Sequence, residues 1–217
     1  MSSSTDLLLL AVVVCDLLIV ATSRVQSCVR ASAFMGIALG LLPLSLWFHG
    51  PGGSLAHVIF MSAGTLVLKA LLIPRLLARA LHTAQARREV EPFISLHASL
   101  IFATVLVGVS FWLANALPLP RAAPSALLLP VAFATLLLGF LVLVSRRKAI
   151  TQIVGYLMIE NGVFVFGQTL TKEMPLMVEL GIFLDLLVGV FVMGIAIYHI
   201  SQEFDDIDTE LLSSLKD

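Results

Sequence analysis

Charge is the first thing that this sequence lacks. Only 12% of its 217 residues are Asp, Glu, Lys or Arg, whereas soluble domains carry about 25%. Hydrophobic residues make up 59% of the chain, and the mean hydropathy is +1.03. Because one globular core cannot bury that much apolar surface, the sequence predicts an integral membrane protein. The net charge of −1 and the lack of a basic patch with interleaved aromatic residues give no sign of nucleic-acid binding.

The chain also lacks the residue patterns of a catalytic or metal site. Its two cysteines, Cys15 and Cys28, make no disulfide framework and have no metal-ligand spacing, and its five histidines are scattered. No phosphate-binding loop and no nucleophile–base pair is visible. We therefore expect no catalytic site, cofactor or metal in this chain, and we expect it to work as a subunit of a larger assembly. The N-terminus lacks signal-peptide features, so we expect the first apolar run to be retained.

Long apolar runs are what the sequence has instead. A membrane-spanning helix needs about 20 mostly apolar residues, and about seven runs qualify, which predicts an all-α polytopic membrane fold. The runs are residues 6–22, 31–49, 55–77, 96–116, 126–144, 149–170 and 176–199. The predicted organisation is 1–95 (helices 1–3 and a loop), 96–125 (helix 4 and a loop), 126–201 (a three-helix unit) and 202–217 (an acidic tail).

The distribution of basic residues predicts the orientation. Lys and Arg are concentrated in the first, third and fifth predicted loops, and the opposite side has only Arg121 and Lys172. Because cytoplasmic loops are enriched in Lys and Arg, these three loops are predicted to be cytoplasmic. With seven helices, the N-terminus would then lie outside and the C-terminus in the cytoplasm.

Four ionisable side chains sit well within the predicted spans, and a fifth, Glu179, lies nearer the end of the last one. A charge at the centre of a membrane helix costs about 2.5–3.5 kcal/mol, so each needs a partner or a function. Glu160 lies about eleven residues into its helix and Asp185 about nine residues from the outer end of its own, which places both near mid-membrane. Lys69 lies nearer the cytoplasmic half, Asp16 lies in the short first helix, and Glu179 is a weaker candidate near the outer end of the last.

A buried membrane acid has two interpretations. It can be a neutral, hydrogen-bonded contact between helices, or it can belong to an ion or proton path. For Asp16 alone we favour the first, because the first helix is short and its acid could reach the outer interface. For Glu160 and Asp185 on consecutive helices, with Lys69 in a third, we favour a shared path. The long stem of Lys69 also allows its amine to snorkel, so its charge need not be buried.

Residues 127–217 resemble the K subunit of respiratory complex I, which is related to the C subunit of multisubunit Na⁺/H⁺ antiporters. The resemblance rests on a basic loop and a helix with a central acid, LVLVSRRKAITQIVGYLMIENGVFVF, followed by a helix with a second acid, ELGIFLDLLVGVFVMGIAIYHI. It places Glu160 at the first membrane glutamate of that family. It places Asp185 at the second, where the family usually has Glu.

At full length the chain resembles the component E family of hydrogenase-4, in the formate hydrogenlyase group of membrane-bound [NiFe] hydrogenases. The resemblance implies a non-catalytic subunit of an oxidoreductase complex in the bacterial or archaeal cytoplasmic (inner) membrane. Its partners would be antiporter-like membrane subunits and a cytoplasmic arm that holds the [NiFe] centre and iron–sulfur clusters. Glu160, Asp185 and Lys69 would then serve proton translocation.

Two other functions stay open at this point. The chain could be a subunit of a cation/proton antiporter or of another complex I relative without a hydrogenase arm, in which case no redox subunits would copurify. It could also be a structural scaffold that seals a membrane domain, in which case its acids would sit in dry helix contacts rather than in a hydrated interior.

Overall fold

The computed structural model describes residues 3–49, 54–83, 94–117, 125–147 and 149–170. The regular elements in this part of the chain are all helices. In chain order they are α1 (Ser3–Ala21), α2 (Val25–His49), α3 (Leu55–Thr65), the π-helix η1 (Leu66–Leu72), α4 (Ile73–Thr83), α5 (Leu96–Ala116), α6 (Leu128–Ser145) and α7 (Ala149–Leu170). Six spans in these residues are long and apolar enough to cross a membrane, with α3, η1 and the start of α4 counted as one.

The helix boundaries agree with the first six predicted spans to within about three residues, apart from two ends. Helix α2 begins at Val25 rather than at residue 31, so the predicted start is wrong. The predicted start placed Arg30 in the first loop, but a helix tolerates this side chain because the backbone forms its hydrogen bonds within the helix. The third span runs on to Thr83 rather than ending at residue 77. The predicted seventh span, 176–199, lies outside the described residues, so the helix count and the orientation stay predictions.

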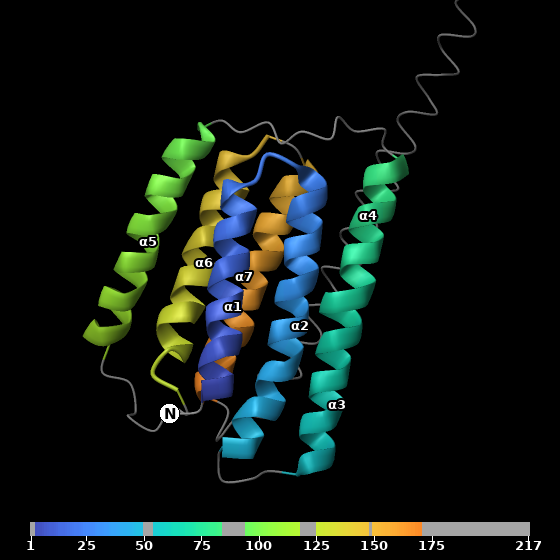
Figure 1. Cartoon of the computed structure of the whole chain (residues 1–217), viewed down its shortest axis with the longest axis vertical. Helices are drawn as coiled ribbons and strands as arrows, with labels where there is room; N and C mark the ends of the chain where they lie inside the picture. Colours follow the sequence, from blue (N-terminus) through green and yellow to red (C-terminus); the bar gives the residue numbers. More distant parts are fainter. Residues whose placement is uncertain (1–2, 50–53, 84–93, 118–124, 148, 171–217) are drawn as a thin grey trace, which may run out of the picture.

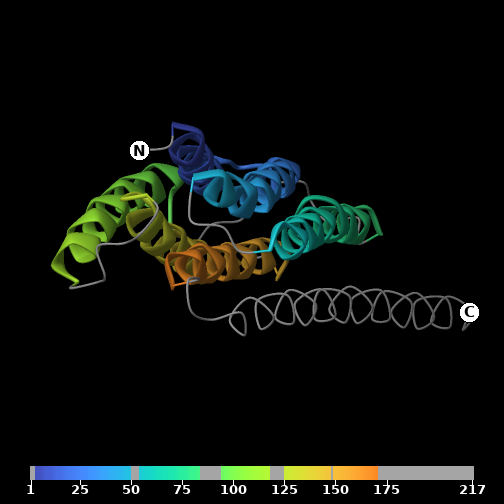
Figure 2. The ribbon, with the colours of Figure 1, turned by 90° about the horizontal axis from the view of Figure 1, so that it is seen from below.

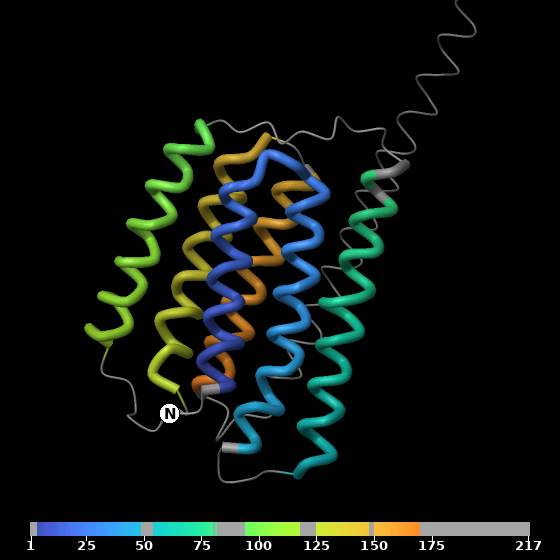
Figure 3. Tube along the Cα trace, viewed as in Figure 1, coloured from blue at the N-terminus to red at the C-terminus, as the bar shows by residue number. Residues whose placement is uncertain are grey.

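The described helices form a central group of four with one element on each side. Figure 2 shows α1 and α2 in one layer and α6 and α7 in the other, with contacts between the layers from α1 to α6 and from α2 to α7. The rod made of α3, η1 and α4 packs along α2, and α5 packs against α6 and α1 on the opposite side (Figure 1). The tube view shows that the rod continues without a break through η1 (Figure 3).

The contact between α6 and α7 is close because glycines line it. A Cβ added at Gly155 would lie 2.6 Å from the backbone nitrogen of Leu143, and one at Gly162 would lie 2.8 Å from the nitrogen of Leu136. Small residues let membrane helices approach in this way.

One end of the bundle, which we call the basic end, holds the α1–α2 and α6–α7 loops (Figure 1). Arg24 and Arg147 are exposed there, whereas the side chain of Arg146 is only 2% exposed. Its Nη2 donates to the carbonyl oxygen of Val20 at 2.7 Å, which caps the last turn of α1. Burial lowers the pKa of the Arg146 guanidinium from its ordinary value. One basic residue of this loop is therefore part of the helix packing.

Candidate functional site

The site begins with an irregular turn that carries Lys69. This lysine occupies the middle of η1, where the N–H of Ile73 donates to the carbonyl of Leu68, five residues back. The next residue is Pro74, which has no N–H and whose ring crowds the carbonyl four residues earlier, so a regular α-helical ladder is interrupted here. Widened turns of this kind often occur at functional sites.

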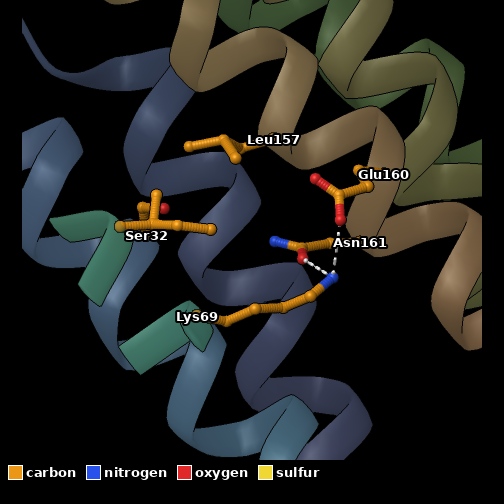
Figure 4. Close-up of a pocket in the computed structure, with 6 residues that line it drawn as sticks. Ser32, Lys69, Leu157, Glu160 and Asn161 are labelled. Carbon is orange, nitrogen blue, oxygen red and sulfur yellow. Dashed lines mark hydrogen bonds and ion pairs between the residues drawn. The ribbon is translucent and has the colours of Figure 1, made fainter. Parts of the chain in front are cut away.

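A glycine on α2 lets this turn reach the centre of the bundle. A Cβ added at Gly36 would lie 2.6 Å from the carbonyl carbon of Lys69, so only glycine fits against the backbone of η1. Gly40 makes the next contact along α2, against Leu66. The side chain of Lys69 then extends past α2 toward α7 (Figure 4). The long stem of Lys69 allows its amine to snorkel out of the bundle, but it does not do so, because Lys69 is 5% exposed.

Glu160 of α7 meets this lysine inside the protein. Lys69 Nζ lies 3.4 Å from Glu160 Oε1, and both side chains are almost completely buried. Charge-assisted N–H···O bonds are usually about 2.7–2.9 Å long, so this ion pair is loose. Neither oxygen of the Glu160 carboxyl has a hydrogen-bond partner among the described residues. Lys69 therefore compensates the charge of Glu160, while both carboxyl oxygens of Glu160 accept no hydrogen bond from the described residues.

One face of α7 supplies the rest of the site. Leu157, Glu160, Asn161 and Phe164 are spaced as neighbours on a helix surface. Lys69 Nζ donates to Asn161 Oδ1 at 2.9 Å, and lies 5.0 Å from the centroid of the Phe164 ring. That distance permits a cation–π contact. The lysine ammonium thus has a carboxylate, an amide oxygen and a ring face as partners.

The amide of Asn161 is fixed from its other side. Its Nδ2 donates to the sulfur of Met35 on α2 at 2.9 Å. Asn161 therefore links α2, η1 and α7, and it holds its oxygen toward Lys69 rather than its NH₂ group. Because Asn161 is 4% exposed, the link lies wholly inside the bundle.

A small cavity adjoins the ion pair. Ser32, Lys69, Ile73, Leu157, Glu160 and Asn161 line a space of ≈ 10 Å³ (Figure 4). A space of about 10–15 Å³ is the minimum for one water molecule, and a buried water also needs two or more polar partners. The lining offers a carboxyl, an amide, an ammonium and a hydroxyl group. A single water between Glu160 and its neighbours is thus compatible with both the space and the chemistry.

Asp16 is held elsewhere in the bundle. It is fully buried on α1, so it does not reach the outer interface, which the short first helix had allowed. Its Oδ2 accepts a hydrogen bond from Thr135 Oγ1 of α6 at 2.7 Å, and its Oδ1 has no partner among the described residues. Asp16 does not line the cavity beside Lys69 and Glu160.

The structure joins two of the five ionisable residues singled out in the sequence. Lys69 and Glu160 meet, Asp16 lies apart, and Asp185 and Glu179 fall outside the described residues. Sequence reasoning missed Asn161, although a polar residue directly after Glu160 in an apolar run was a usable signal. It also missed Gly36 and Met35, for which no comparable signal exists. Where the chain is described, no three His, Cys, Asp or Glu side chains are grouped to hold a metal ion.

These features define a class: a polytopic helical membrane protein with a charge pair inside its helix bundle. The chain belongs to the same family as the uncharacterized protein Rv0085 of Mycobacterium tuberculosis, with 33% identity over 208 residues, or 94% of this chain and 92% of that protein.

A second relative has a descriptive name. The chain is 28% identical over 160 residues, 74% of each chain, to hydrogenase-4 component E of Escherichia coli strain K12, and equally so to that of Shigella flexneri. This similarity supports the resemblance to component E seen in the sequence, while the K-subunit resemblance of residues 127–217 stays a prediction. No protein-family model and no solved structure matches the chain.

Proposed function

We propose that this chain is a membrane subunit of a complex I-related [NiFe] hydrogenase complex, and that Lys69 and Glu160 form a proton-transfer site in it. Its similarity to hydrogenase-4 component E supports the first part. The [NiFe] centre and the iron–sulfur clusters would belong to partner subunits on the cytoplasmic side, and antiporter-like subunits would adjoin this chain in the bacterial or archaeal inner membrane.

The observation that carries the proton role is the loose, buried pair between Lys69 and Glu160. In its charged form the pair is an ammonium and a carboxylate 3.4 Å apart. Transfer of one proton from Lys69 to Glu160, directly or through a water in the adjoining cavity, leaves an amine and a carboxylic acid with the same net charge. Because two buried charges carry a large desolvation cost, the two forms are closer in free energy inside the bundle than in water.

A small movement would shift the balance between these two forms. The attraction between two charges at low dielectric changes steeply with distance. Displacement of η1 relative to α7 would therefore favour the neutral form, and its return would favour the charged form. Asp185, in the predicted span 176–199, is proposed as the next proton station after Glu160, with Glu179 as a weaker candidate beyond it.

The decisive experiment separates a relay from a buried structural contact. Glu160→Gln alone removes the titrating group but leaves Lys69 without its counter-ion. The double variant Lys69→Met with Glu160→Gln removes both charges, so that assembly is restored if the single change destabilises the chain. We expect the assembled double variant, in reconstituted vesicles, to lose most coupled proton movement. Full proton movement in the double variant would overturn the relay and favour a structural role.

Asp16→Asn is the matched control, because it also replaces a buried acid by an amide but touches no cation. We expect normal assembly and normal proton movement.

Purification of the full chain in mild detergent tests the first part of the proposal. We expect subunits with [NiFe] and iron–sulfur centres to copurify, whereas antiporter subunits without redox centres would contradict the hydrogenase assignment.

A further inference from the structure

A second and larger cavity lies at the basic end, away from the ion pair. It measures ≈ 160 Å³ and is partly open. Its walls come from the first turns of α2 and the last turns of α4, which pack against each other (Figure 1). The lining residues are Gln26, Val29, Arg30, Ala78 and Leu81. None of these lines the cavity beside Lys69 and Glu160.

The cavity is lined by apolar side chains and by one cationic side chain, Arg30. Val29 and Leu81 are buried, whereas Arg30 is exposed. The Arg30 guanidinium forms no hydrogen bond or ion pair with another residue in the described part of the chain. Its five N–H donors are therefore directed to whatever occupies the cavity or the solvent beside it.

The position along the helices is that of a membrane–water boundary. Helix α4 buries Ile73, Leu77 and Leu81 on one side and exposes Arg75 and Arg79 on the other. It is the amphipathic end of an otherwise apolar span, which ends at Arg79. Arginine side chains at such a boundary reach the lipid headgroups while their stems cover apolar surface.

We propose that this cavity binds the headgroup of an anionic phospholipid. Arg30 would bind the phosphate with paired N–H donors, the geometry in which guanidinium recognises phosphate best. Gln26 would add one further polar contact, and the apolar surface of Val29, Ala78 and Leu81 would receive the start of an acyl chain. Basic pockets between membrane helices bind anionic lipid headgroups by the same chemistry. The proposal does not depend on the proton role of Lys69 and Glu160.

The test measures how much lipid the full chain retains. The chain is purified in mild detergent, with any subunits that copurify, and is mixed with phosphatidylglycerol or phosphatidylcholine. Native mass spectrometry counts the bound lipids. We expect phosphatidylglycerol to be retained in preference to phosphatidylcholine. Arg30→Gln should weaken that retention about tenfold, because a hydrogen-bonded charge is lost. Arg24→Gln, which removes the same charge from an exposed residue in the adjacent loop, should leave retention unchanged.

Two further measurements keep the proposal open to refutation. Ala78→Phe fills the cavity without changing charge, and it should also reduce phosphatidylglycerol retention. Competition with inorganic phosphate separates a lipid site from a site for the free ion. Equal losses in Arg30→Gln and Arg24→Gln, equal retention of both lipids, or displacement of phosphatidylglycerol by millimolar phosphate would each overturn the assignment.

Discussion

Two carboxyl groups lie buried in this bundle in opposite surroundings. Glu160 on α7 faces the ammonium of Lys69 at 3.4 Å, beside a space of water size. Asp16 on α1 faces only the hydroxyl of Thr135, at 2.7 Å, and no described cation lies within ion-pair distance of it. Equal burial thus produces different chemistry, because a nearby cation decides whether a carboxylate can keep its charge.

The surroundings of Asp16 indicate a structural role. A second hydrogen bond of the same kind lies nearby. Ser125 Oγ, in the turn before α6, donates to Asp6 Oδ1 of α1 at 2.6 Å. Both acids of α1 therefore pair with hydroxyl groups 119 positions later in the chain, which matches two helices that run in parallel. We interpret Asp16 as a neutral acid that holds α1 against α6.

The largest effect on this difference between Glu160 and Asp16 is expected when the cation, Lys69, is removed. Lys69→Met leaves Glu160 buried with no positive partner, and loss of one member of a buried pair costs about 3–5 kcal/mol of unfolding free energy. Thermal unfolding of the purified chain measures this loss. The double variant with Glu160→Gln should recover most of it. Equal stability of the single and the double variants would show that the two charges are not coupled.

A smaller effect is expected when the lysine is displaced rather than removed. Gly36→Ala places a methyl group 2.6 Å from the backbone of Lys69, and overpacking of this kind costs about 1–3 kcal/mol. Gly64→Ala is the matched control, since no neighbour among the described residues lies within 4 Å of a Cβ at that position. We expect it to be neutral or slightly stabilising, because alanine favours the helix. Similar unfolding temperatures for the two variants would contradict the close contact between α2 and η1.

The smallest effect is expected at the other acid. Asp16→Asn keeps an acceptor for Thr135 and removes no charge from a neutral acid, so stability should change by less than about 1 kcal/mol. Infrared difference spectra of the wild type and the variant should reveal a protonated carboxyl band that is lost in the variant. A carboxylate band at Asp16, or a loss of proton movement in Asp16→Asn, would place this acid in the path with Glu160.

The spans were predictable because hydrophobicity acts locally. Each helix needs enough apolar residues in a row, and this property can be counted along the chain, so α5 and α7 match their predicted limits and the other described spans differ only at their ends. The same counting identified Lys69, Glu160 and Asp16 as ionisable residues in apolar surroundings. Their existence and approximate depth are properties of the sequence.

The partners of these residues are a property of the tertiary structure alone. Lys69 and Asn161 are 92 positions apart, and no local pattern tells which helices pack or which faces meet. The pairing depends on Gly36, which lets η1 approach α2, and on a widened turn before Pro74, which positions Lys69. The sequence by itself determined that ionisable residues lie within the apolar spans. Packing decided that Glu160 has a cation and Asp16 only a hydroxyl group, because interactions between ionisable groups depend on distances in space.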